Sequence, residues 1–212
     1  MDVSERRAQF EQIALQLFAT KGYHSTKISD IVKQVGVAQG TFYWHFSSKE
    51  EIALSIIKEG KEKLLEVVNR GYRESAGTTE DMLQSSRNLI SSYLHFASQN
   101  RDLMAFIFLK GQGADTSIRN EISKIFVSIE TAFANNINRA MQLKMLKKDQ
   151  NPELRAMMLT SLLNGTIERW LFGPLREQDY TPGESIDMVA DHLVQFEFFG
   201  LLSGGIQDGN NG

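Results

Sequence analysis

Apolar residues recur at helical spacing along nearly the whole chain. The first such run consists of Phe10, Ile13, Ala14, Leu17 and Phe18, at positions i, i+3, i+4, i+7 and i+8. A second, shorter run consists of Ile28, Ile31, Val32 and Val35. Gly22 and Gly36 follow these runs, and glycine is a typical residue just after a helix end. No stretch alternates with period two for long, so the pattern predicts an all-α protein.

The spacing also predicts where the later helices lie. Ser48 and Glu51 form the sequence signature of a capping box, in which each side chain satisfies the backbone amide of the other residue, so a fourth helix begins there. Further helices are expected near 80–98, 102–110, 115–147, 152–172 and 184–202, which gives about nine in total. We expect a three-helix domain at residues 1–47, a helical bundle at 48–203 and a disordered tail at 204–212.

Five large rings stand in an unbroken row at residues 42–46, within the third short helix. At 100° per residue, Phe42 and Phe46 point to the same side, toward the first two helices, whereas Trp44 lies nearly opposite. Tyr43 borders the outer side. Two alternatives follow for the outward rings: they pack against a neighbouring helix, or they contact an external partner.

The residues around the outward rings suit nucleic acid as that partner. Two short amphipathic helices joined by a turn containing glycine match a helix-turn-helix. Gly40 allows close approach of a partner, and Gln39 has the side chain for bidentate contact with adenine. Hydroxyl and ring N–H groups on Thr41, Tyr43 and His45 can donate to phosphate or base edges.

Residues 10–57 closely resemble the N-terminal domain of the TetR family of bacterial transcriptional regulators. The matching pattern consists of Ala14, Phe18, Gly22, Tyr23, Thr26, Ile28, Ile31, Val35, Gly36, Val37, Gly40, Thr41, Phe42, Tyr43, His45, Phe46, Ser48, Lys49, Glu50 and Glu51. The resemblance implies a recognition helix at about residues 38–44 in the major groove of an operator. Ala38 departs from the pattern, because relatives often have a capping serine there.

The resemblance also implies which residues touch DNA. Positions matching Thr26, Tyr43, His45 and Lys49 typically touch phosphates, and those matching Gln39, Gly40, Thr41 and Trp44 lie where bases are read. The complete expected DNA-binding set is Thr26, Lys27, Gln39, Gly40, Thr41, Tyr43, Trp44, His45 and Lys49. Thr26 is expected to cap the second helix as well.

Charge adds only a weak indication of DNA binding. The chain of 212 residues has a formal net charge of −3. Residues 1–50 carry six Lys and Arg against five Asp and Glu, a balance of +1. We therefore expect few cationic phosphate contacts in each half-site, and a negative but modest dependence of affinity on salt.

The remainder of the chain resembles the family in architecture only, which implies dimerisation and a small-molecule pocket. Seven of the eight methionines and nine of the 13 phenylalanines follow residue 57. Methionine adapts to irregular ligands, although such residues also serve as ordinary core. The candidate ligand-binding residues are Tyr93, Phe96, Phe106, Phe126, Asn136, Asn164, Glu168 and Arg169.

Two apolar stripes near the C-terminus are candidates for a two-fold symmetric dimer interface. The stripes either pair between subunits as a four-helix interface or pack within one subunit. The candidate interface residues are Met158, Leu162, Gly165, Ile186, Val189, Leu193 and Phe196.

Other functional classes receive no support from the sequence. There is no cysteine and the four histidines are widely spaced, so we expect no metal site and no cofactor. No catalytic motif is present, and no apolar run is long enough for a membrane span. We expect a cytoplasmic homodimeric repressor that binds a palindromic or near-palindromic DNA operator and is released by an apolar or amphipathic effector. The alternative is a DNA-binding dimer without an effector, whose bundle serves dimerisation or a protein partner.

Overall fold

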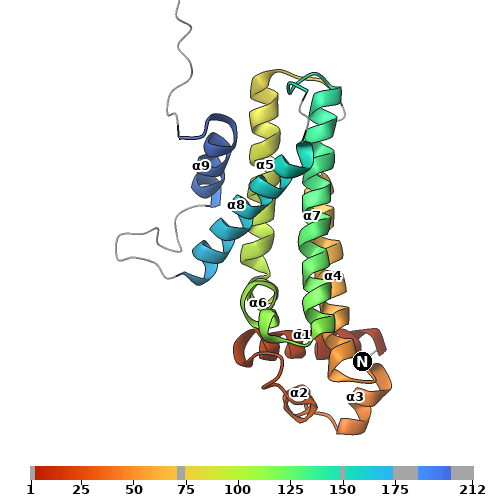
Figure 1. The fold of residues 1–212 in the computed structure, drawn as a ribbon. Helices are drawn as coiled ribbons and strands as arrows, with labels where there is room; N and C mark the ends of the chain where they lie inside the picture. Colours follow the sequence, from red (N-terminus) through yellow and green to blue (C-terminus); the bar gives the residue numbers. More distant parts are fainter. Residues whose placement is uncertain (1–2, 71–74, 149–150, 174–185, 202–212) are drawn as a thin grey trace, which may run out of the picture. The chain divides into compact units, whose positions relative to one another are not determined.

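The computed structural model describes residues 3–70, 75–148, 151–173 and 186–201, and these residues contain helices and no strand (Figure 1). The α-helices are α1 (Val3–Lys21), α2 (Ile28–Val35), α3 (Gln39–His45), α4 (Lys49–Arg70), α5 (Thr79–Gln99), α6 (Arg101–Ala105), α7 (Thr116–Gln142), α8 (Pro152–Phe172) and α9 (Ile186–Phe199). Two short helical segments, η1 (Phe106–Lys110) and η2 (Gly111–Gly113), connect α6 to α7. The all-α class and the number of helices agree with the sequence pattern.

Two helix boundaries differ from the expected ones. The helix expected at 102–110 is divided into the α-helix α6 and the π-helical turn η1. Helix α7 ends at Gln142 rather than at 147, because Lys144 adopts a left-handed φ of 60°. The amide of Met145 then donates to the carbonyl of Ala140 at 2.9 Å, which closes the helix end. The tail expected at 204–212 lies outside the described residues.

The chain packs into two compact units. Unit 1 comprises Met1–Glu66 and Ala97–Ile129, and unit 2 comprises Val67–Phe96 and Glu130–Gly212. The first part of α4 belongs with the short helices because its Gly60 lies directly against Leu103 of α6. A Cβ atom placed on Gly60 would lie 2.7 Å from a Leu103 methyl group, so a larger residue there would force the Leu103 side chain to move.

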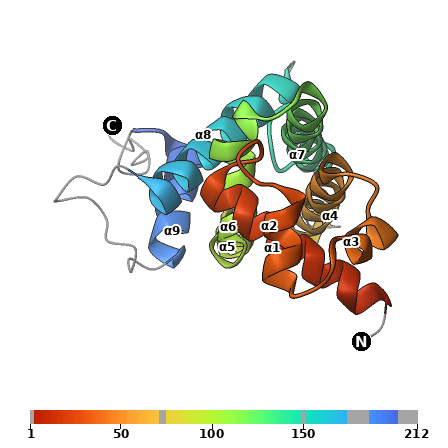
Figure 2. The same ribbon diagram turned by 90° about the horizontal axis from the view of Figure 1, so that it is seen from below.

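The core of unit 1 is aromatic. Phe10 and Phe18 of α1 are both fully buried. The ring of Phe18 packs on that of Phe106 in η1, with centroids 5.3 Å apart. Helices α2 and α3 lie beside α1 and are joined by a tight turn at Gly36 (Figure 2). This arrangement packs the short helix α3 against α1 and α2 of the same unit.

Unit 2 is built from α5, the second part of α7, α8 and α9. Its buried residues include Ile90 and Leu94 of α5, Phe133 of α7, and Ile167 of α8. At the surface, the Arg87 guanidinium on α5 lies 2.5 Å from the Asp191 carboxylate on α9. This pair joins α5 to α9, but it is partly exposed and contributes little stability alone.

Candidate nucleic-acid interface and ligand cavity

The aromatic row on α3 is divided between the interior and the solvent. Phe42 and Phe46 are buried, with 0% and 1% of their surface exposed, whereas Trp44 is 90% exposed and Tyr43 51% exposed. The predicted orientations are thereby confirmed. Within the described residues, the outer rings do not pack into a neighbouring helix.

The buried rings of the row are held by Phe10. The ring of Phe10 meets that of Phe42 edge-on, with centroids 5.5 Å apart, and that of Phe46 at 6.4 Å, also edge-on. Edge-to-face contacts of this kind add about 0.5–1.5 kcal/mol beyond the burial of area. Burial of Phe42 and Phe46 therefore sets the rotation of α3 about its own axis, and with it which side chains face outward.

Arg7 of α1 also holds α3, a role that sequence reasoning missed. Its Nη1 donates to the carbonyl oxygen of His45, the last residue of α3, at 2.8 Å, and its guanidinium lies 4.1 Å from the centre of the Phe46 ring. Its Nη2 donates to the Ser55 hydroxyl at 3.2 Å. A cation at a helix C-terminus interacts favourably with the carbonyls there. The sequence offered no signal, because Arg7 and His45 are 38 positions apart.

The start of α3 has no side-chain cap. Ala38 occupies the N-cap position without a side-chain hydrogen bond, as the departure from the family pattern predicted. The preceding turn is made by Gly36, whose φ of 78° ends α2 and whose amide donates to Val32 at 2.9 Å. The amide of Thr41 donates to the carbonyl oxygen of Ala38 at 3.0 Å, and no side chain caps the preceding amides of α3.

Most of the predicted DNA-contacting residues share one accessible surface of unit 1. Lys27, Gln39, Gly40, Tyr43 and Trp44 are exposed, and Thr41 and His45 are half-buried. A Cβ atom on Gly40 would meet nothing within 4 Å, so the protein itself does not require glycine there. This surface combines a small residue, amide, hydroxyl and aromatic groups on one short helix.

Thr26 does not belong to this surface, which corrects the prediction made for its hydroxyl. The residue is fully buried, and its hydroxyl donates to the carbonyl oxygen of Gly22 at 2.9 Å and lies 3.3 Å from that of Leu17. It does not cap α2 either, because Lys27 is the N-cap residue. The hydroxyl instead ties the end of α1 to the loop that precedes α2.

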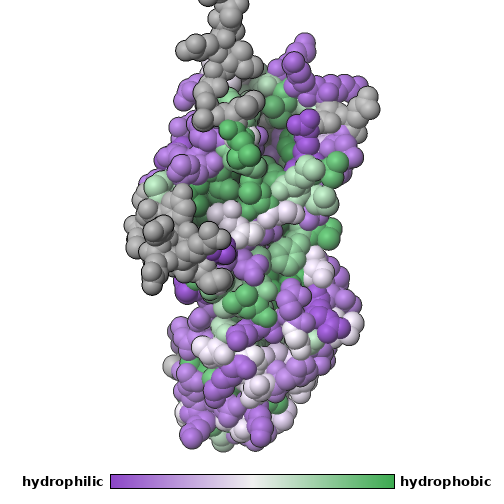
Figure 3. Space-filling view, turned by 60° about the vertical axis from the view of Figure 1, so that its left-hand side comes forward, coloured by the Kyte–Doolittle hydropathy of each residue, from purple (hydrophilic) through white to green (hydrophobic). Residues whose placement is uncertain are grey.

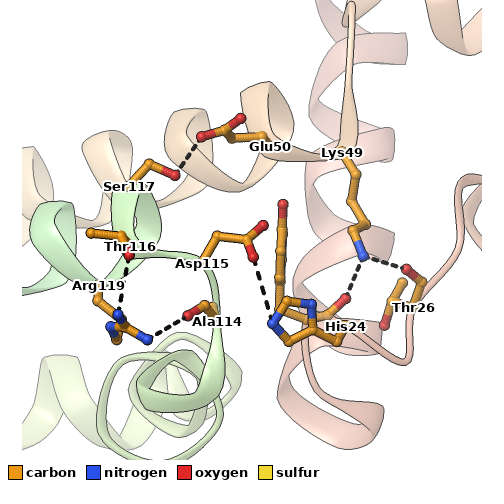
Figure 4. Close-up of polar contacts among 10 residues, drawn as sticks. His24, Thr26, Lys49, Glu50, Ala114, Asp115, Thr116, Ser117 and Arg119 are labelled. Carbon is orange, nitrogen blue, oxygen red and sulfur yellow. Dashed lines mark hydrogen bonds and ion pairs between the residues drawn. The ribbon is translucent and has the colours of Figure 1, made fainter.

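Lys49 is partly occupied by contacts within unit 1 (Figure 4). Its Nζ donates to the carbonyl oxygens of Tyr23 at 2.7 Å and Thr26 at 2.9 Å, and it lies 4.2 Å from the centre of the Tyr23 ring. Burial lowers the pKa of Lys49, and the negative charge of Asp115 opposes that change. An ammonium has three donors, so one is left for a phosphate.

The loop held by Lys49 is also tied to the start of α7. His24 Nε2 lies 3.6 Å from Asp115, and the Ser117 hydroxyl donates to the Glu50 carboxylate (Figure 4). Burial, with the negative charges of Asp115 and Glu50, raises the pKa of Tyr23 to about 12. The phenol therefore stays neutral in this cluster at physiological pH.

The predicted capping box at the start of α4 is only half present. The amide of Glu51 donates to the Ser48 hydroxyl at 3.1 Å, as expected. The Glu51 carboxylate, however, accepts from the amide and hydroxyl of Ser47, both at 2.7 Å, rather than from the Ser48 amide. These two hydrogen bonds lower the pKa of Glu51.

A cavity of about 430 Å³ lies within unit 2. Its walls come from α5, α7, α8, α9 and residues 145–146, and most of them are apolar. The polar lining residues are Ser85, Ser86, Asn136, Arg155 and Glu197. Small-molecule pockets commonly measure about 300–1,000 Å³ and combine apolar walls with a few polar groups, so the cavity has suitable size and chemistry for a ligand.

Two polar groups of the cavity wall are unusual. Within the described part of the chain, the Nδ2 of Asn136 is buried and has no hydrogen-bond partner. The Glu197 carboxylate accepts from the Ser86 hydroxyl, yet burial outweighs this bond and raises the pKa of Glu197 to about 7. An unmade hydrogen bond at a buried donor costs about 1–3 kcal/mol, which a ligand oxygen would recover.

Of the eight residues predicted to bind a ligand, only Asn136 lines this cavity. Tyr93 is buried and donates to Asn164 at 2.9 Å, and Phe96 is buried near it along α5. Phe106 and Phe126 belong to unit 1, and Glu168 and Arg169 are exposed on α8. A ligand role for these seven stays a prediction, and the cavity gives it no support.

The residues predicted for the dimer interface are exposed to different extents. Met158 is 61% and Phe196 44% exposed, and Gly165 is exposed too. Leu162, Ile186 and Val189 are half-buried, while Leu193 is buried within the unit. Figure 3 shows hydrophobic side chains gathered on this face, among the helices of unit 2. Met158, Leu162 and Phe196 also line the cavity.

Comparison with known proteins identifies the family. Residues 12–56 match the model of bacterial regulatory proteins of the tetR family. This N-terminal segment belongs to the family. The N-terminal helices thus form the DNA-binding domain of a transcriptional regulator. A fatty acid metabolism regulator protein of Bacillus subtilis is 24% identical over 195 residues, which cover 91% of this chain and 97% of that protein. The AcrR regulator of Shigella flexneri is 25% identical over 178 residues, covering 82% of this chain and 81% of that protein.

Solved structures share the fold of this chain. FadR from Bacillus subtilis, in complex with stearoyl-CoA, matches with a TM-score of 0.74 and 22% identity over 92% of this chain and 99% of that chain. FadR from Bacillus halodurans matches with a TM-score of 0.77 and 18% identity over 95% of this chain and 98% of that chain.

Two further features of the described residues concern metals and membranes. No group of three or more His, Cys, Asp or Glu side chains is placed to hold a metal ion in the described ranges. Among the helices there, none combines the length and the apolar character that crossing a bilayer requires.

Proposed function

We propose that the protein is a homodimeric, cytoplasmic repressor that binds a palindromic or near-palindromic operator and leaves it when an amphipathic effector binds. The observation that carries the DNA-binding part is the exposure of Tyr43 and Trp44 above the buried Phe42 and Phe46. Exposed large aromatic side chains leave apolar area in contact with water. A major groove offers partners for both their apolar and their polar parts. Each subunit places Gln39–His45 in one groove.

The exposed apolar face of α8 and α9 supports the dimer. Met158 and Phe196 stand on this face with Gly165, which permits close approach of a second helix. A two-fold axis through such a face brings the same residues together from both subunits. Two recognition helices are then available for half-sites about 34–36 Å apart, or a multiple of that distance.

The cavity of unit 2 supports an effector. Its walls are apolar with a few polar groups, and the related FadR from Bacillus subtilis was solved with stearoyl-CoA. We therefore propose a molecule with a long apolar chain as the effector of this protein. Binding would shift the protein between two states by the difference in its affinity for them.

Selection of binding sites from random duplex DNA tests the DNA-binding part. We expect a two-fold symmetric consensus, and an affinity that falls modestly with salt. A reporter placed behind the selected site should be expressed more strongly when the gene for this protein is deleted. Lower expression on deletion would identify an activator instead.

Sedimentation tests the dimer. Met158→Glu places a charge in the proposed interface and should yield a monomer with much weaker operator binding. Val127→Glu is the matched control, because Val127 is an exposed apolar residue of unit 1, 60% exposed. A Met158→Glu protein that remains dimeric would place the interface elsewhere.

Thermal shift against long-chain compounds separates the effector model from the alternative without one. A ligand that raises the melting temperature and lowers operator affinity supports the effector. Absence of any stabilising compound favours a bundle that serves only dimerisation or a protein partner.

A further inference from the structure

The unpartnered side-chain amide of Asn136 indicates which kind of ligand atom the cavity binds. The Nδ2 is a donor, buried on α7, and its side chain forms part of the cavity wall. Most of the wall around it is apolar and cannot accept a hydrogen bond. A ligand atom that satisfies this donor must therefore be a hydrogen-bond acceptor, and an oxygen is the strongest common choice.

The charges on the wall restrict the acceptor further. Glu197 lines the same cavity from α9 and is held by the Ser86 hydroxyl. A ligand carboxylate in the cavity would lose its hydration, which is unfavourable. A neutral carbonyl oxygen accepts from Asn136 without this cost.

Arg155 provides a separate place for negative charge. It lies in the first turns of α8, lines the cavity and is exposed to solvent. An anionic group near Arg155 keeps its hydration, whereas one placed deep in the cavity does not. The wall thus separates a neutral acceptor position from a hydrated anionic position.

The volume sets a scale for the apolar part of the ligand. A cavity of about 430 Å³ equals the volume of about fourteen water molecules at roughly 30 Å³ each. Because a methylene group is of similar size to water, the space suits a chain on the order of a dozen carbons or more.

We propose that Asn136 is the specificity-determining residue of the cavity and that it donates to the carbonyl oxygen of a long-chain acyl ester or thioester with an anionic headgroup. This inference rests on the proposed effector function and goes further, by naming the ligand group and the residue that reads it. For this reason, free fatty acids, which carry a carboxylate, bind less well than such an ester or thioester. Alkyl compounds without a carbonyl also bind less well.

Three probes isolate the carbonyl in calorimetric titrations of the full chain below the micelle concentration. They are palmitoyl-CoA, its thioether analogue S-hexadecyl-CoA, which lacks only the carbonyl oxygen, and palmitate. We expect palmitoyl-CoA to bind about 3- to 10-fold more tightly than the thioether, as one hydrogen bond to a buried donor allows. Palmitate should bind more weakly than palmitoyl-CoA.

The variant Asn136→Ala tests whether this residue causes the difference in affinity between palmitoyl-CoA and the thioether. In this variant palmitoyl-CoA and the thioether should bind with equal affinity. Asn135→Ala is the matched control, because Asn135 is the exposed neighbour on the same helix, outside the cavity wall, and it should retain the discrimination. Circular dichroism melts of both variants establish that they fold.

The outcomes distinguish failure of the inference from failure of the proposed function. Equal binding of palmitoyl-CoA and the thioether by the wild-type chain overturns the role of Asn136 but leaves an acyl-chain effector in place. The role of Asn136 is also overturned if Asn136→Ala still binds palmitoyl-CoA more tightly than the thioether. The same holds if the wild-type chain binds palmitate more tightly than palmitoyl-CoA. Absence of binding by all three probes overturns the long-chain effector itself and the inference with it.

Discussion

Nη1 of Arg7 donates to the carbonyl oxygen of His45 at 2.8 Å, so the first helix closes the C-terminus of the recognition helix. The guanidinium also stacks on the Phe46 ring at 4.1 Å, on the buried side of α3. Arg7 therefore holds α3 in the orientation that presents Tyr43 and Trp44.

Substitution of Arg7 should weaken DNA binding by misplacing α3 rather than by removing a phosphate contact. Arg7→Ala should lower operator affinity at least tenfold and cost about 1–2 kcal/mol of stability, because a charge-assisted hydrogen bond and a stacking contact are lost. The slope of affinity against salt should stay unchanged, as measured by fluorescence anisotropy. A contact with phosphate would instead reduce that slope by about one.

The control for Arg7 is Arg6→Ala, which removes the same charge one position away. Within the described residues, the Arg6 guanidinium donates to the Gln9 side chain on the same helix at 2.7 Å. We expect this variant to keep near wild-type affinity. Equal losses from both variants would indicate a general effect of charge and contradict a positioning role for Arg7.

The two sides of the aromatic row should respond in opposite ways. Phe42→Ala should cost about 3–5 kcal/mol in urea denaturation, because it leaves a cavity beneath α3. Trp44→Ala and Tyr43→Phe should leave the unfolding free energy nearly unchanged and weaken operator binding. A stable Phe42→Ala protein would mean that the core does not depend on this ring, and unchanged affinity in Tyr43→Phe would remove its hydroxyl from the interface.

Substitution of Gly40 should have opposite effects on the stability of the protein and on its affinity for DNA. A Cβ atom there meets no protein atom within 4 Å, so Gly40→Ala should stabilise α3 by up to about 1 kcal/mol. The same methyl group would stand on the surface that approaches the groove and should weaken operator binding severalfold. Calorimetric melting and anisotropy measure the two effects. A rise in both stability and affinity would show that DNA does not approach this position closely.

Protonation of Glu197 should make stability depend on pH. Burial raises its pKa from 4.5 to about 7 in the folded chain, so the folded state binds the proton more tightly than the unfolded state. Unfolding free energy should therefore decrease as pH rises from about 4.5 to 7, and level off above that. The change is at most about 3–4 kcal/mol at roughly 1.4 kcal/mol for each tenfold change in proton affinity, and water in the cavity reduces it.

Glu197→Gln should flatten this part of the pH profile in the ligand-free protein, as followed by urea denaturation at several pH values. Glu168→Gln makes the same change at an exposed position of α8 and should leave the slope as it is. If the Glu197→Gln profile retains the full slope between pH 4.5 and 7, another group is responsible.

Local geometry explains which features were predictable. The spacing of apolar residues fixed the short helices, and the 100° turn per residue placed Phe42 and Phe46 opposite Trp44 without knowledge of any other helix. Gly36 ends α2 because its left-handed φ of 78° suits glycine, another local property. The absence of a cap at Ala38 follows from the side chain alone.

The sequence by itself thus determined most of the helices, the inner and outer sides of α3 and the family of the N-terminal segment. Tertiary packing decided the rest, because the contacts concerned join residues far apart in the chain. It buried the Thr26 hydroxyl, directed Lys49 to the carbonyl oxygen of Thr26 at 2.9 Å, and brought Arg7 to His45. The cavity around Asn136 depends on how four separate helices pack. The spacing of apolar residues within one helix does not predict the space that remains between several helices.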